Sequence, residues 1–242
     1  MIHQNLSMMK RFCYAAVCCT GMIAAAACSS STHIVIRDAE DYTLTAEFVP
    51  SSLLEKNITR LLTQKNTQPD EQSVFNRREL KESLTNAGIS VTDMSLIGAM
   101  GLRVACTIPY RHTLLKDFIN YDRNKQRTVL RISPENISAF LGMLPQESRD
   151  FIDLLMAPLF TGDSIGPAEY EELNSAAYGK KIAAELRNAA FILTVDVPYA
   201  IQSAQITPIG AVTIQKKTGS RASIHIPLLE LLCTTGIIEV QL

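Results

Sequence analysis

The order in which strand-like and helix-like segments follow one another constrains the fold of this chain most. Residues 42–49 and 191–198 are alternating or rich in β-branched side chains, which predicts strands near both ends of the chain. Apolar residues at helical spacing dominate between them, for example in residues 168–190. Because strands and helices are grouped, the pattern favours an α+β fold, in which an antiparallel sheet forms from N- and C-terminal strands and the central segment is helical.

Capping and turn residues refine this outline. Asn76 with Glu79 resembles a capping box, Gly88 suits a helix end, and Ser133 followed by Pro134 predicts another helix start. Further helices are expected over residues 51–64, 111–122, 145–160 and 168–190, the last one weakened at Gly179. Further strands are expected over residues 33–36, 89–110 with a glycine-marked turn, 126–133, 199–232 with a turn at 218–220, and 236–242.

The length of 242 residues fits one large domain or two small ones, and 47% hydrophobic residues suffice for a core. We expect residues 34–242 to form a single α+β domain with a helical insertion around residues 112–190. The alternative is a separate all-helical domain over about residues 112–190. A formal net charge of −1 provides no basic field, which argues against a nucleic-acid partner.

The N-terminal segment has a composition of its own. Lys10 and Arg11 precede residues 12–28, which contain no charged side chain. A positive segment followed by an apolar one and by small residues is typical of a signal peptide. The alternatives are an uncleaved membrane helix and a plain secreted protein. Three methionines offer a start for translation: Met1, Met8 and Met9.

The sequence Ala25-Ala26-Ala27-Cys28 resembles the lipobox of bacterial lipoproteins, although Ala25 stands where leucine is usual. The resemblance implies that residues 1–27 are a lipoprotein signal peptide and that Cys28 carries acyl chains. Multiple acyl chains give stable membrane anchoring. Residues 28–33 are then expected to be a lipidated cysteine with a polar tether. This reading places the protein in a bacterial cell envelope, anchored by lipid and facing the periplasm or the exterior.

Two further stretches carry a resemblance to a family. One is the C-terminal series "FILTVDVPYAIQSAQ", "SIHIPLLELL" and "IEV", and the other is the early strand "DYTLTAEFVP". In these two regions the chain resembles LppM-like envelope lipoproteins. The resemblance implies an envelope protein with a lipid-binding role and offers no catalytic residues to carry over. Several such proteins have a basic tail and a transmembrane helix near the C-terminus, which the sequence up to Leu242 lacks.

Catalytic motifs are weak in this sequence. The histidines that follow Cys28, namely His33, His112 and His225, are far apart, and no cysteine–histidine spacing suggests a metal site. "GDSI" resembles the signature of a serine esterase family around Ser164, but Ala222 stands where that family has an aspartate three residues before a late histidine. We therefore expect no enzyme and no cofactor, with an envelope serine esterase using Ser164 as the alternative.

Thiols and apolar segments leave several alternatives open. Cys106 and Cys233 form either a disulfide or two buried free thiols, since both lie in apolar surroundings. The sequence also predicts a pocket for an apolar ligand such as an acyl chain. Its candidate lining consists of residues 96–102, Leu141, Leu144, Phe151 and Leu155. A protein-interaction module is a further alternative, in which residues 236–242 form a sheet edge that pairs with an envelope protein.

Overall fold

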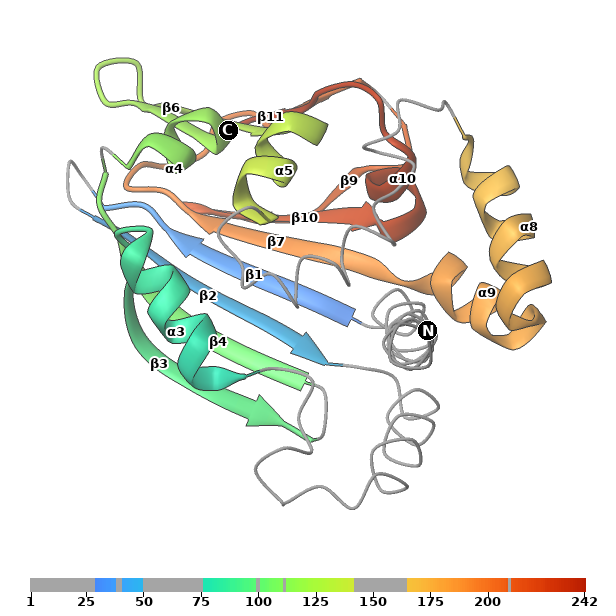
Figure 1. Cartoon of the computed structure of the whole chain (residues 1–242). Coiled ribbons are helices and arrows are strands. Elements are labelled where there is room, and N and C mark those ends of the chain that lie inside the picture. Colours follow the sequence, from blue (N-terminus) through green and yellow to red (C-terminus); the bar gives the residue numbers. More distant parts are fainter. Residues whose placement is uncertain are drawn as a thin grey trace.

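The computed structural model describes residues 29–37, 41–49, 76–98, 101–110, 112–141, 165–208 and 210–242. These residues form two sheets with helices packed beside them, so the α+β class is confirmed (Figure 1). The predicted helices over 51–64 and 145–160 lie outside the described residues, as do Cys28 and Ser164.

The larger sheet has seven strands in the order β3-β4-β2-β1-β7-β10-β9. Neighbouring strands are antiparallel except β1 and β7, which are parallel. The β1–β7 pair joins an N-terminal half to a C-terminal half, which agrees with the expected sheet built from both ends of the chain. The strands are β1 (Ser29–Val35), β2 (Tyr42–Val49), β3 (Ser90–Ile97), β4 (Gly101–Ile108), β7 (Ala190–Asp196), β9 (Thr213–Thr218) and β10 (Arg221–Pro227).

The expected polar tether over residues 28–33 is wrong for residues 29–33, because they belong to β1 in the middle of the larger sheet. Ser30 lies opposite Phe48 of β2 and also opposite Phe191 of β7. Polar composition misled the prediction. A strand with one face away from the core can carry serine and threonine, since backbone hydrogen bonds to two neighbours hold it in place.

The smaller sheet has the order β5-β6-β11-β8, with β5 (Ile119–Asp122), β6 (Arg127–Ile132), β8 (Gln205–Thr207) and β11 (Ile238–Gln241). The alternative of a separate all-helical domain over about residues 112–190 is therefore wrong, since β5 and β6 form a hairpin there. β6 agrees with the strand expected over 126–133, whereas β5 was not expected. The helix predicted over 111–122 ends at Phe118, as α4 (Thr113–Phe118). Ile119 and Tyr121 are buried while Asn120 is exposed, which is the alternation of a strand.

The strand expected over residues 236–242 is present as β11, but its expected place at a sheet edge is wrong. β11 pairs with β6 on one side and with β8 on the other, so its backbone offers no free edge. The described sheets instead end at β3 and β9 and at β5 and β8. Both edges of the larger sheet contain register irregularities, and β9 carries Lys216 and Lys217. Bulges and lysines on an edge strand disfavour the addition of a further strand.

The helices begin and end largely where local signals predict. In α3 (Arg77–Asn86) the Asn76 side chain accepts a hydrogen bond from the Glu79 amide, and Gly88 follows with a positive φ. In α5 (Pro134–Leu141) the Ser133 and Asn136 side chains each accept a hydrogen bond from the other residue's backbone amide. Both predicted helix starts are confirmed.

Two predictions of secondary structure, one of a helix and one of a strand, need correction. The helix expected over 168–190 is broken into α8 (Pro167–Tyr178) and α9 (Lys180–Asn188), because Gly179 adopts a φ of 91°. A positive φ of this size costs glycine little free energy, and it ends the helical conformation at this residue. Residues expected to extend the last strands of the meander form α10 (Leu228–Cys233). Leu229 and Leu232, three positions apart, are its buried residues.

One face of the larger sheet packs against the smaller sheet, and a single hydrophobic core lies between them. Ile34, Val195 and Ile224 come from the larger sheet, and Leu130 and Val240 come from the smaller one. A second hydrophobic cluster joins α8, α9 and α10, and a third lies between α3 and the strands β3 and β4. Figure 1 shows α3 beside these two strands. Among the described helices, none has the length and apolar character needed to cross a bilayer.

Candidate functional site

The face of the larger sheet that points away from the core is polar. The core-facing residues of β1, β7 and β10 are residues 34, 193, 195, 222 and 224. Because side chains alternate along a strand, the residues next to these point to the opposite face. Thr45, His33, Thr194 and Ser223 form a row across β2, β1, β7 and β10, since each is the register partner of the next. All four are half-buried. We call this surface the polar face.

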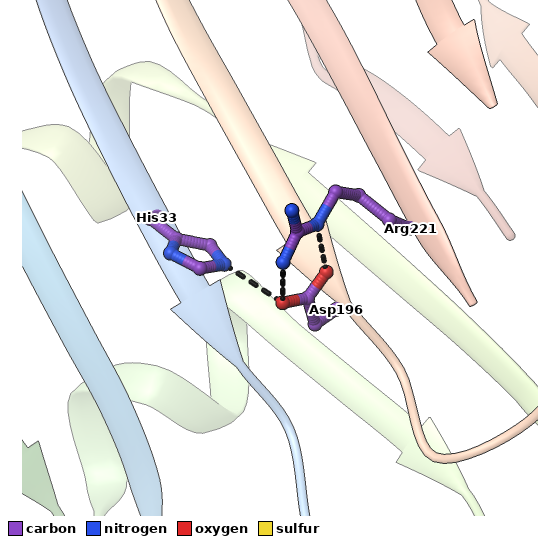
Figure 2. Close-up of polar contacts among 3 residues, drawn as sticks. All are labelled: His33, Asp196 and Arg221. Carbon is purple, nitrogen blue, oxygen red and sulfur yellow. Dashed lines mark hydrogen bonds and ion pairs between the residues drawn. The ribbon is translucent and has the colours of Figure 1, made fainter. Parts of the chain in front are cut away.

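A cluster of three ionisable side chains lies on the polar face at one end of the sheet (Figure 2). Asp196, the last residue of β7, is the register partner of Arg221, the first residue of β10. Arg221 donates from Nε and Nη2 to the two carboxylate oxygens of Asp196, at 2.5 and 2.6 Å. His33 Nε2 of β1 lies 2.9 Å from Asp196 Oδ2. The relative exposures of the His33, Asp196 and Arg221 side chains are 40%, 21% and 54%.

Electrostatics keep the Asp196 carboxylate charged. The hydrogen bonds and charge of Arg221, with a smaller contribution from His33, lower the pKa of Asp196. The same carboxylate raises the pKa of Arg221. The cluster therefore presents a carboxylate neutralised by a two-pronged guanidinium, together with an imidazole that this carboxylate orients.

The cluster does not complete a hydrolytic set within the described residues. The hydrogen bond recorded there for the His33 side chain goes to Asp196, and none joins it to a serine, threonine or cysteine. A histidine oriented by a carboxylate activates a nucleophile only when that nucleophile lies within hydrogen-bond reach. Within the described residues, the cluster therefore offers partly exposed hydrogen-bond donors and acceptors on the polar face.

The other two candidate histidines lie elsewhere. His112 Nε2 lies 2.6 Å from the carbonyl oxygen of Ala87 at the end of α3, and its Nδ1 is buried without a partner in the described structure. His225 lies on the polar face, as the register partner of Ile192. The described residues contain no group of three or more metal-ligating side chains.

The two cysteines carry free thiols, so the disulfide alternative is not realised. Cys106 is buried among the residues under α3, and Cys233 packs against the cluster formed by α8, α9 and α10. Burial raises the pKa of each thiol to about 11, and Glu230 adds to the effect at Cys233. Both side chains therefore act as apolar packing groups near neutral pH.

Most of the lining predicted for the apolar pocket lies outside the described residues, so this pocket stays a prediction. Leu96 and Leu102 are register partners within the β3–β4 hairpin, while Leu144, Phe151 and Leu155 lie outside the described residues, as does the side chain of Leu141. A cavity of about 220 Å³ lies beside the hairpin, between α3 and β3. Arg77, Arg78 and Lys81 help to line it, so it is not the apolar enclosure that an acyl chain requires.

The cluster of His33, Asp196 and Arg221 was missed from the sequence. Alternation in "ILTVDV" does place Asp196 on the face of its strand opposite Val195, so the sequence indicates that Asp196 lies on a polar face. The pairing of β1 with β7 spans more than 150 residues of sequence. No local pattern reports such a pairing.

In comparisons with known proteins, the chain matches no protein-family model, no curated protein and no solved structure.

Proposed function

We propose that the protein is a lipid-anchored lipoprotein of the bacterial cell envelope with a non-catalytic binding role. One observation carries the proposal: a lipobox-like sequence ends in Cys28, and Ser29 directly after it begins a central strand of the folded domain. Cleavage before Cys28 removes residues 1–27 and leaves every described strand intact. The lipid is then attached one residue from the sheet.

The position of β1 determines what such an anchor displays. From Ser29 to Val35 the strand covers about 20 Å, at roughly 3.3 Å per residue. Asp196 is the register partner of Val35 and of Arg221, so the cluster lies at the end of the sheet far from Cys28. An anchor at Cys28 holds the Ser29 end of the polar face beside the membrane. The charged cluster then lies at the other end of the sheet, which is the end distal to the membrane.

The chemistry of the polar face favours a polar partner from the envelope. Threonine, serine and histidine side chains offer hydrogen bonds, and an apolar ligand on this face leaves those groups unpaired, which is costly. The described residues show no enclosed apolar site that favours an acyl ligand instead. We therefore place binding on the polar face, through hydrogen bonds with the side chains of β1, β7 and β10.

Metabolic labelling of cells with a radioactive fatty acid tests the anchor. We expect label in the native chain, loss of label in Cys28→Ala, and unchanged label in Cys19→Ala, a matched substitution within the same uncharged segment. Label retained in Cys28→Ala contradicts the proposal. An esterase assay tests the non-catalytic part: hydrolysis by the native chain that disappears in Ser164→Ala contradicts it.

A further inference from the structure

The β3–β4 hairpin and the start of β1 lie at the same end of the larger sheet (Figure 1). Ser30 is the register partner of Phe48, Phe48 is the partner of Leu102, and Leu102 is the partner of Leu96. Neighbouring strands are about 4.8 Å apart, so Ser30 and Leu102 are about 10 Å apart across the sheet. The hairpin end therefore lies beside Ser29, the residue that follows Cys28.

The residues at this hairpin end are uncharged, and all but the buried Gly101 are partly open to solvent. Leu102 also packs against the cluster under α3. Leu96, Ile97 and Leu102 are half-buried, and Gly98 is exposed. Gly101 has no room for a side chain, because an added Cβ atom meets the carbonyl oxygen of Ile97 at 2.4 Å. We call Leu96, Ile97, Gly98, Gly101 and Leu102 the apolar tip.

Other hairpin turns among the described residues differ in chemistry. The β5–β6 turn, Asp122 to Arg127, carries two further charged residues, Arg123 and Lys125. The β9–β10 turn lies at the opposite end of the larger sheet and is flanked by Lys217 and Arg221. The turn at the Cys28 end of the sheet is therefore uncharged, and the β9–β10 turn at the other end is charged. This difference suits a domain with the first end at a bilayer and the second end in water.

Charges around the apolar tip balance one another. Arg103 of β4 donates from Nε to Glu47 of β2 at 2.7 Å, and Arg78 lies 4.0 Å from Glu82. Among the described residues, the hairpin strands with the neighbouring β2 and α3 carry four cations and four acids, namely Arg77, Arg78, Lys81 and Arg103, and Glu47, Glu79, Glu82 and Asp93. With equal numbers of each sign, attraction to anionic lipid is weak, and apolar burial supplies the affinity.

We infer that the apolar tip inserts into the headgroup–acyl boundary of the bilayer that holds the lipid on Cys28. The inference rests on the proposed lipid anchor, because that anchor turns this end of the sheet toward the membrane. Insertion of the tip adds a second contact beside the lipid and fixes the tilt of the domain. The cluster of His33, Asp196 and Arg221 is then held in water at the distal end.

Tryptophan fluorescence tests the inference directly, because the chain contains no tryptophan. The full lipidated chain carrying Ile97→Trp is reconstituted in phosphatidylcholine vesicles with and without phosphatidylcholine brominated near the glycerol end of its acyl chains. The matched control is Tyr110→Trp, an aromatic exchange at the opposite end of β4 with 37% exposure. Leu96→Trp is a second tip variant for the case that Ile97→Trp does not fold.

We expect brominated lipid to quench the tip variant at least about twofold and to leave the control unchanged, with little effect of added salt or anionic lipid. Quenching of the tip variant by aqueous acrylamide but not by brominated lipid overturns the inference. Resistance to both quenchers also overturns it, because the chain itself then covers the tip. Fatty-acid labelling of Cys28 is scored separately, so loss of the anchor and loss of tip insertion are distinguishable.

Discussion

Replacing Asp196 with asparagine tests the cluster on the polar face. The variant keeps the shape of the side chain and removes the charge that Arg221 and His33 contact. Exposed ion pairs contribute about 0.2–1 kcal/mol, and a two-pronged arginine contact lies toward the upper end of that range. We therefore expect the free energy of unfolding to fall by about 1 kcal/mol near pH 7. For a chain of this size the melting temperature then falls by roughly 2–4 °C.

The pH dependence of this loss gives the sharper test. The pKa of Asp196 is lower in the folded protein than the usual value of about 3.9 in an unfolded chain. Its charge therefore stabilises the fold fully above about pH 4, and this contribution disappears as the pH falls through the lower folded-state pKa. Native and Asp196→Asn chains are expected to differ near pH 7 and to converge at the acid end.

Urea unfolding of the full chain in mild detergent, followed by circular dichroism across this pH range, measures the effect. Asp117→Asn, an exposed aspartate in α4, is the control and should change stability by less than about 0.5 kcal/mol. Asp196→Asn combined with Arg221→Gln should lose less than the sum of the two single losses. A loss that is equal at all pH values, or fully additive effects, refutes this account of the cluster.

Three further predictions concern the core and its thiols. Tyr199→Phe should lower the free energy of unfolding by about 1–3 kcal/mol in urea titrations, because the buried Tyr199 hydroxyl lies 2.8 Å from Thr128 Oγ1; a loss below about 0.5 kcal/mol contradicts this. Gly101→Ala should shift the thermal midpoint downward, since the added Cβ meets backbone oxygen; an unchanged midpoint shows that the strand relaxes freely. Cys106 and Cys233 should react with iodoacetamide near pH 8 about a hundredfold more slowly than an exposed thiol, measured by peptide mass spectrometry, because their pKa is about 11; equal labelling rates exclude burial as described.

Elements defined by neighbouring residues were predicted well. The caps of α3 and α5 depend on side chains three positions apart, so Asn76 with Glu79, and Ser133 at the start of α5, were visible in the sequence. The helix-ending role of Gly88 and the turn at Gly219 likewise follow from local backbone conformation.

The errors have a common physical origin. Ser29 to Thr32 look like a tether by polarity, yet pairing with β2 and β7 makes them a central strand. Residues 228–233 read as a strand because they are apolar and follow one, yet burial of Leu229 and Leu232 favours a helix. In each case tertiary contacts supply more free energy than the local preference of the segment.

The sequence by itself determined the α+β class, most strand and helix positions, and the expectation of a lipid on Cys28, because these depend on periodicity and on a short motif. Only the tertiary structure decided that β11 is internal, that Cys106 and Cys233 remain apart as free thiols, and that His33, Asp196 and Arg221 meet. These outcomes depend on the partners that strands distant in the chain choose. That choice follows from burying one common core between two sheets, and no segment carries it alone.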